Sequence, residues 1–124
     1  MIAFDIEVLC DLLRDSNLSS KARLCYFVLH WFASKKNGCF PSYNDLAYTM
    51  NVSKESVNKA IKELERNRYI YVGKRQARNT RGKMRIYSNV YFMYNSNERF
   101  EIIEEGKNPN DIIRERLKKM SGKI

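Results

Sequence analysis

The most restrictive feature of this 124-residue chain is a pair of helix starts within the segment from Pro41 to Val72. Ser42 is expected to cap a helix that runs to about Met50, with Asp45 three residues later as a variant of the capping box. A tight turn follows, and Ser53 is expected to cap a second helix. Apolar residues recur in that helix at i, i+3, i+4 and i+7, namely Val57, Ala60, Ile61 and Leu64. This spacing predicts one buried stripe and an opposite, exposed side.

A segment rich in basic residues follows the second helix. Tyr69 to Val72 and Ile86 to Tyr94 are rich in β-branched and aromatic residues, which predicts two strands of a hairpin. Most of the bases are expected in the loop between these strands. From Arg66 to Arg85 the chain has 8 Lys and Arg residues and no Asp or Glu, whereas the other 104 residues contribute only +1 to the net charge of +9. Such a local excess attracts a polyanion.

Two helices are predicted before this region. Residues 5–14 are expected to form the first helix, with Ile6, Leu9 and Leu13 on its apolar side. Ser19 is expected to cap the second, which runs to about Lys36. The second helix is apolar on two sides, one with Leu24, Phe27, Val28 and Trp31, the other with Ala22, Tyr26, Leu29 and Ala33. A helix of this kind is either central in its domain or shared with a partner. A turn then leads into a short extended piece at residues 39–41.

Two more helices are predicted after the hairpin. One follows Asn95 and runs to about Glu105, and Asn108-Pro109 opens the other. The last helix has an apolar stripe of Ile113, Leu117 and Met120. No repeat, low-complexity tract or Pro/Gly-rich linker divides the chain, so residues 1–124 are predicted to form a single α+β domain.

Residues suited to catalysis or metal binding are few. The single histidine, His30, lies in an apolar helix and is expected to be structural. The cysteines are odd in number and form no Cys-x-x-Cys pair, which argues against a disulfide framework and a zinc site. We expect Cys10, Cys25 and Cys39 to be small buried side chains in a reducing cytoplasm. Asp11 and Asp15 can share a helix face, but nothing nearby completes a metal site, so we expect both to be solvated. The prediction is therefore a protein that is not an enzyme and has no metal or cofactor.

No small-molecule ligand is evident from the sequence. No apolar run reaches the length of about 20 residues that a membrane span needs, and the N-terminus lacks a basic region typical of a signal peptide. The expected location is the cytoplasm, without a membrane partner.

The exposed side of the helix after Ser53 has residue types that suit DNA. At about 100° per residue, its polar and charged side chains lie opposite the buried stripe. The helix N-terminus offers free N–H groups and the positive end of the helix dipole to a phosphate. Asn, Lys and Ser can read base edges in the major groove, and Glu can accept from a cytosine amine. The alternative is a solvated helix face with ordinary caps. The residues predicted to contact DNA from the two capped helices are Ser42, Tyr43, Ser53, Lys54, Glu55, Ser56, Asn58, Lys59, Lys62 and Arg66.

The predicted hairpin adds a second set of candidate contacts. Bases without acids on a thin projection repel one another unless an anion neutralises them, so phosphate contact explains their number. An Arg at the tip could enter a minor groove. The alternatives are a solubilising loop and a lipid-binding loop, although the loop lacks the apolar face of a membrane-surface helix. The predicted contacts are Lys74, Arg75, Arg78, Asn79, Arg81, Lys83 and Arg85.

The chain resembles the winged helix-turn-helix domains of Gram-positive plasmid and phage proteins over about Leu18 to Tyr94. These proteins include replication initiators, replisome organisers and small regulators. The residues that carry the resemblance are Phe40-Pro41-Ser42, Leu46-Ala47, Val52-Ser53, Ser56-Val57, Ala60 to Glu65 and Tyr69-Ile70. The resemblance implies a winged helix-turn-helix core over 18–94, a β-hairpin wing, an added N-terminal helix and a C-terminal helical extension over 97–121. Only about 30 residues follow the wing, too few for the further domain expected of a complete initiator.

The predicted function is double-stranded DNA binding as a homodimer, with a regulatory or organisational role on a mobile element, foremost in transcription. The dimer is expected to form through the second apolar side of the helix after Ser19 and through the terminal helices. One alternative is an accessory protein in plasmid or phage replication, partition or conjugative transfer. A protein-interaction module that docks its basic hairpin on an acidic partner is another. Single-strand binding by base stacking is disfavoured, because most Tyr and Phe residues fall at core or strand positions.

Overall fold

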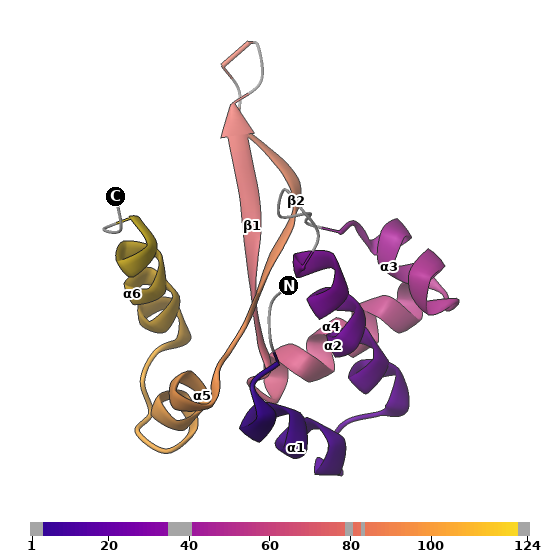
Figure 1. The fold of residues 1–124 in the computed structure, drawn as a ribbon. Helices are drawn as coiled ribbons and strands as arrows, with labels where there is room; N and C mark the ends of the chain where they lie inside the picture. The colour runs from indigo at the N-terminus through magenta and orange to yellow at the C-terminus, as the bar shows by residue number, and fades with distance from the viewer. Residues whose placement is uncertain (1–3, 35–40, 79–80, 83, 122–124) are drawn as a thin grey trace.

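The computed structural model describes residues 4–34, 41–78, 81–82 and 84–121, and within the hairpin it describes residues 74–78 and 84–88 as backbone. In this part of the chain, six helices and one antiparallel hairpin form the fold (Figure 1). The elements are α1 (Ile6–Arg14), α2 (Ser20–Ala33), α3 (Tyr43–Met50), α4 (Lys54–Arg66), β1 (Ile70–Arg78), β2 (Met84–Met93), α5 (Ser96–Ile103) and α6 (Pro109–Ser121). Lys36 and the predicted extended residues Cys39 and Phe40 lie outside the described residues.

The predicted helix starts are confirmed by their caps. Ser19 accepts a hydrogen bond from the backbone N–H of Ala22 at the start of α2. Ser42 and Asp45 form a complete capping box on α3. The turn between α3 and α4 is tight because Asn51 takes a left-handed conformation with φ 58°, which Asn adopts more readily than most residues.

Asp5 caps two helices at once. Its Oδ1 atom accepts hydrogen bonds from the N–H groups of Glu7 and Val8 at the start of α1. Its Oδ2 atom accepts a hydrogen bond of 2.8 Å from the N–H of Ser96, the first residue of α5. The N-terminal helix and the C-terminal extension therefore share one carboxylate.

The main core lies between α1, α2, α3, α4 and the base of the hairpin. The stripe predicted for α4, Val57, Ala60, Ile61 and Leu64, is buried, as expected. Helix α2 packs against both α3 and α4, and the ring of Tyr26 lies 6.3 Å from the ring of Tyr69 at the hairpin base. Helix α2 is therefore central, and its position explains why both of its sides are apolar.

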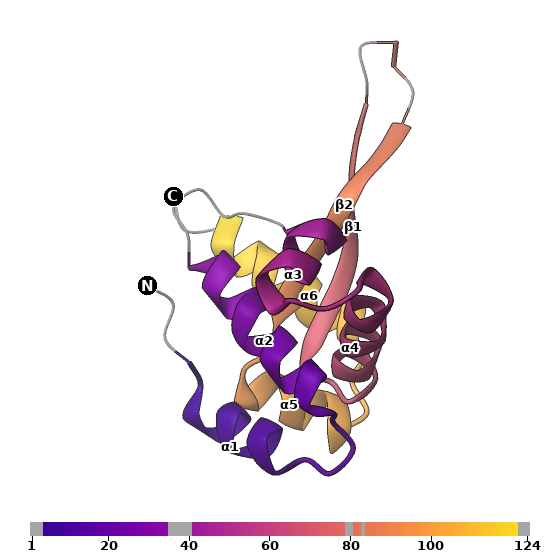
Figure 2. The same ribbon diagram turned by 90° about the vertical axis from the view of Figure 1, so that its right-hand side faces the viewer.

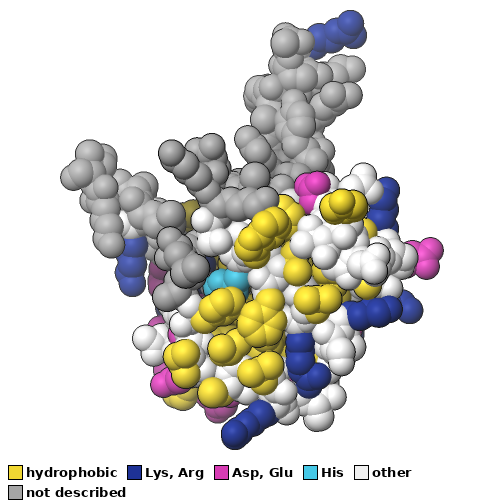
Figure 3. Space-filling view, turned by 45° about the vertical axis from the view of Figure 1, so that its right-hand side comes forward, with side chains coloured by type: hydrophobic (Ala, Val, Ile, Leu, Met, Phe, Trp, Pro, Cys, Tyr) yellow, Lys and Arg dark blue, Asp and Glu magenta, His cyan; other side chains and the backbone are white. Residues whose placement is uncertain are grey.

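Two of the predicted apolar faces are wrong in detail. In α1 the buried residues are Val8 and Leu12, whereas Ile6 is 68% and Leu13 54% exposed, because the i, i+4 pair faces the core. In α2 the side expected to face a partner is buried within the monomer: Ala22, Tyr26 and Leu29. The other side remains partly uncovered, since Leu24 and Trp31 are exposed. Figure 3 shows apolar side chains gathered on this face of the molecule.

The hairpin is longer than predicted. Its two strands pair from Ile70 with Met93 to Arg78 with Met84, with an irregularity after Arg75. The bases Lys74, Arg75, Arg78 and Arg85 therefore lie in strands and not in the loop. The error has a physical reason: the hairpin projects beyond the helices (Figures 1 and 2), and the backbone hydrogen bonds between its strands do not require apolar residues.

The C-terminal extension packs on a second, smaller core. Figure 1 shows α5 and α6 on the opposite side of the hairpin from α2, α3 and α4. The buried residues of this core are Tyr94, Ile102, Ile112 and Ile113. The apolar stripe predicted for α6 is thus confirmed at Ile113. The prediction is wrong at Leu117, which is exposed, and it did not include Ile112, which is buried. The side chain of Met120 lies outside the described residues.

Candidate nucleic-acid interface

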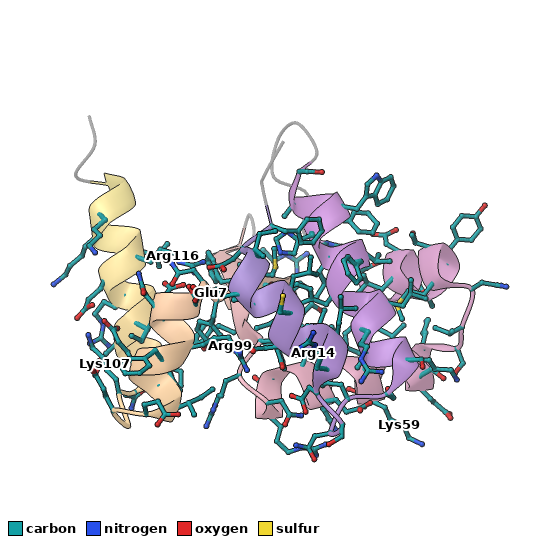
Figure 4. All side chains as sticks on the ribbon, turned by 60° about the horizontal axis from the view of Figure 1, so that its bottom comes forward. Glu7, Arg14, Lys59, Arg99, Lys107 and Arg116 are labelled. Atoms are coloured by element: carbon teal, nitrogen blue, oxygen red, sulfur yellow. The ribbon has the colours of Figure 1, made fainter. Side chains whose placement is uncertain are left out.

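The exposed side of α4 is the centre of the candidate interface. Glu55, Lys59, Lys62 and Arg66 are all exposed and lie opposite the buried stripe. Figure 4 shows the side chain of Lys59 directed away from the body of the molecule. In Figure 2 the hairpin rises above α3 and α4, so that the basic wing and this helix lie along one flank. Two elements with excess positive charge thus border the same side of the molecule.

The N-terminus of α4 is held by serines. Ser53 Oγ accepts a hydrogen bond from the N–H of Ser56 and donates one to Ser56 Oγ, both at 3.1 Å. Lys21 of α2 donates from Nζ to Ser56 Oγ at 3.3 Å. The sequence prediction missed Lys21, because only the crossing of α2 and α4 brings it here. A third cation, in addition to Lys54 and Lys59, therefore lies near this helix start.

Tyr43 and Asn58 form a pair that orients the interface. The Tyr43 hydroxyl donates to Asn58 Oδ1 at 3.2 Å, and both side chains are half-buried. Burial raises the pKa of Tyr43, so its hydroxyl keeps the proton that it donates. The bond fixes the amide of Asn58 beside the exposed side of α4. Tyr43 thus connects α3 to α4 as well as lying at the start of its own helix.

For the remaining predicted DNA contacts, the structure gives the exposure of the side chain or the position of the backbone alone. Ser42 and Lys54 are exposed at the starts of α3 and α4. Arg81 is exposed at the tip of the hairpin, and the strands carry the backbone of Lys74, Arg75, Arg78 and Arg85. Asn79 and Lys83 lie outside the described residues. The structure therefore joins α3 to α4 at Tyr43 and Asn58 and places the backbone of the strand bases along a projecting ribbon.

Asp11 and Asp15 are not simply solvated, as the sequence suggested. Asp11 Oδ2 forms an ion pair of 2.8 Å with Nη1 of Arg99 in α5. Asp15 Oδ2 accepts a hydrogen bond of 2.9 Å from the hydroxyl of Tyr69. Partners 88 and 54 residues away leave no local signal in the sequence. Asp11 thus links α1 to α5, and Asp15 links the end of α1 to the base of the hairpin.

The histidine and two of the cysteines can also be placed. His30 is buried, with Nε2 at 3.3 Å from the hydroxyl of Tyr26. Cys25 is buried, as predicted, and burial raises the pKa of its thiol to about 12. Cys10 is exposed, so the prediction that it is buried is wrong, because α1 turns Val8 and Leu12 inward instead. Cys39 lies outside the described residues.

The described residues were compared with what a metal site and a membrane-spanning helix require. Among them, no group of three or more His, Cys, Asp or Glu side chains could hold a metal ion. None of the helices in the described ranges is long and apolar enough to span a membrane.

The order of the elements defines the fold class. Helices α2, α3 and α4 followed by a two-stranded hairpin form an α+β winged helix-turn-helix, as the sequence predicted. Residues 16–70, from just before α2 to the first residue of β1, match a family described as a helix-turn-helix domain. A solved structure described as a possible transcriptional regulator from Methanosarcina mazei Go1 is 15% identical, with a TM-score of 0.47 over 96% of this chain and 85% of that chain. No curated protein matches the sequence.

Proposed function

We propose that this protein binds double-stranded DNA through α4 and the hairpin. The observation that carries the proposal is the exposed side of α4, which holds Lys59, Lys62 and Arg66 beside the base-rich hairpin. A major groove about 12 Å wide admits an α-helix. Side chains of α4 then read base edges, and the hairpin bases neutralise phosphates.

The N-terminal end of α4 fits a position close to the DNA backbone. Its serine cap leaves other N–H groups of the first turn available, and Lys21 and Lys54 add charge there. Glu55 is an acidic side chain on this exposed side, and a carboxylate can accept a hydrogen bond from a cytosine amine. The combination favours recognition of particular base pairs over binding by charge alone.

The biological role that we propose is regulation, foremost of transcription, on a plasmid, phage or other mobile element. The resemblance of residues 18–94 to the winged domains of such elements supports this role. An accessory role in replication, partition or conjugative transfer is the second candidate, because the same resemblance covers initiators and replisome organisers. We also propose that the protein acts as a homodimer, which would pair two recognition helices across a palindrome.

Replacing the wing bases tests DNA binding. The double variant Arg78→Ala and Arg81→Ala should bind every duplex more weakly. The slope of log affinity against log salt should become shallower by about 0.9 for each phosphate that the wing no longer neutralises. Arg14→Gln in α1 is a matched control, because it removes an exposed base on another part of the surface (Figure 4). An unchanged salt slope in the double variant would remove the wing from the interface. Tight binding to an acidic protein, without salt-dependent duplex binding, would favour the protein-interaction module.

A further inference from the structure

A hollow of about 380 Å³ lies between the C-terminal end of α4 and the N-terminal end of α6. Three basic residues line it, Lys62 and Arg66 from α4 and Arg68 from the turn that follows. Asn110 of α6 forms part of the opposite wall, and the Tyr71 hydroxyl donates to its Oδ1 atom at 2.8 Å. Because Lys62 and Arg66 also belong to the exposed side of α4, the hollow is continuous with the candidate DNA interface.

The charge of this hollow is not balanced within the described part of the chain. None of its three bases forms an ion pair there, and the acid that lines the hollow is Glu65. The bases of the neighbouring extension behave differently. Each of Lys107, Arg114 and Arg116 pairs with an acid of α5 or α6. In the described residues, the bases that line the hollow without forming an ion pair thus come from α4 and the turn that follows it.

Arg68 is held in this position by its backbone. It has φ 64°, a left-handed conformation that Gly and Asn adopt more easily than Arg. Its carbonyl oxygen accepts a hydrogen bond of 2.9 Å from Nε of Arg99, and its N–H donates to the carbonyl of Glu65. A long basic side chain at a strained backbone position, next to an interface, points to a function for that side chain.

We propose that this hollow holds a backbone phosphate of duplex DNA next to the base pairs that α4 reads. Arg68, Lys62 and Arg66 supply the charge, and the first turn of α6 forms the second wall. The interface then extends from the helix-turn-helix to the C-terminal extension. This inference rests on the proposed function, and it adds Arg68 and Asn110 to the residues at the DNA.

Two substitutions test the hollow by different means. Arg68→Asn removes the charge and suits the left-handed backbone, and Arg68→Lys keeps the charge as its matched control. Asn110→Asp adds a negative charge to the hollow, and an acid in the first turn of a helix favours folding. The carboxylate can still accept the hydrogen bond from Tyr71.

Binding to a labelled duplex is measured by fluorescence anisotropy over a salt series, and folding by urea denaturation. We expect Arg68→Asn to make the salt slope shallower by about 0.9, with several-fold weaker binding to all duplexes, and Arg68→Lys to keep the wild-type slope. Asn110→Asp should weaken binding several-fold at a urea midpoint that does not fall.

Wild-type binding by both Arg68→Asn and Asn110→Asp would overturn the inference. The double wing variant separates this result from failure of the proposed function. If the wing variant loses affinity while the two hollow variants do not, the protein binds DNA without the hollow. If the wild type binds no duplex, the proposed function fails as well.

Discussion

The guanidinium of Arg99 lies 4.0 Å from the centre of the Tyr69 ring. It also donates to Asp11 of α1 and to the carbonyl oxygens of Asn67 and Arg68 at the end of α4. Arg99, a residue of the C-terminal extension, therefore donates hydrogen bonds to the carbonyl groups directly after α4, the helix that we propose to read DNA. The arrangement makes the position of α4 depend on α5 and α1.

Removing the Arg99 guanidinium should destabilise the protein. Arg99→Met keeps an apolar stem but leaves two backbone carbonyls and one carboxylate without their donor. We expect the free energy of unfolding to fall by about 2–4 kcal/mol, measured by urea denaturation. Asp11→Asn is the control, and it should cost less than about 1 kcal/mol because the Asp11 side chain is 62% exposed. Equal losses in the two variants would show that the ion pair, and not the carbonyl contacts, provides the stabilisation.

Lys59→Ala should relax sequence preference without loss of stability. Its side chain is exposed, so the urea midpoint should not move. Discrimination at one or two base pairs should fall by about 1–3 kcal/mol, measured by competition between duplexes that differ at single positions. Equal loss on specific and random duplexes would contradict a role in base readout.

Asn58→Ala should behave differently from Lys59→Ala. It removes the acceptor of the Tyr43 hydroxyl, so we expect a loss of about 1 kcal/mol in stability in addition to any change in DNA preference. Tyr43→Phe removes the same hydrogen bond and leaves Asn58 in place. If Tyr43→Phe keeps its DNA preference and Asn58→Ala does not, the amide of Asn58 contacts a base.

His30 should make stability depend on pH. Burial lowers the pKa of His30 in the folded protein below the ordinary value of 6.5. As the pH falls through 6.5, the unfolded chain takes up a proton that the folded protein does not, so the free energy of unfolding decreases. Urea midpoints between pH 5 and 8 measure this effect, with His30→Gln as the comparison. A wild-type midpoint that stays as flat as that of His30→Gln would contradict it.

The proposed homodimer should form through the uncovered apolar side chains of α1 and α2. Tyr26 and Leu29 are buried in the monomer, so the exposed Leu24 and Trp31 remain as the candidates on α2. Sedimentation at micromolar concentration should show a dimer that Leu24→Gln with Trp31→Gln converts to a monomer. A wild-type monomer that binds a single half-site with full affinity would exclude the dimer.

The features predicted best are those that depend on neighbours in the sequence. The serine caps, the tight turn between α3 and α4 and the buried stripe of α4 each involve residues within about two helical turns. The position of α2 was also predictable in part, because two apolar sides indicate a central helix. Within α4, the candidate residues Glu55, Lys59, Lys62 and Arg66 are exposed for the same reason, because helical periodicity fixes which side chains share a face.

The features that were missed depend on residues far apart in the chain. Lys21 reaches Ser56 only because α2 packs against α4, and Arg99 reaches Asp11 only because the fold brings α5 near α1. Arg68 had no sequence signal, since its left-handed backbone arises from the fold of the α4–β1 turn. The length of the hairpin was missed because its outer part has few apolar residues to show the alternation of a strand.

The carboxylate of Asp5 gives the two ends of the fold a common response to acid. The hydrogen bond from the N–H of Ser96 is the main reason that the pKa of Asp5 lies below its ordinary value. Its contribution to stability is therefore complete above about pH 4 and is lost as the pH falls through the lower pKa of the folded protein. A single protonation neutralises the carboxylate that accepts from the first turn of α1 and from the first turn of α5, so both caps become weaker together. Acid should thus loosen the two helices in one concerted step, although 91 residues separate Asp5 from Ser96.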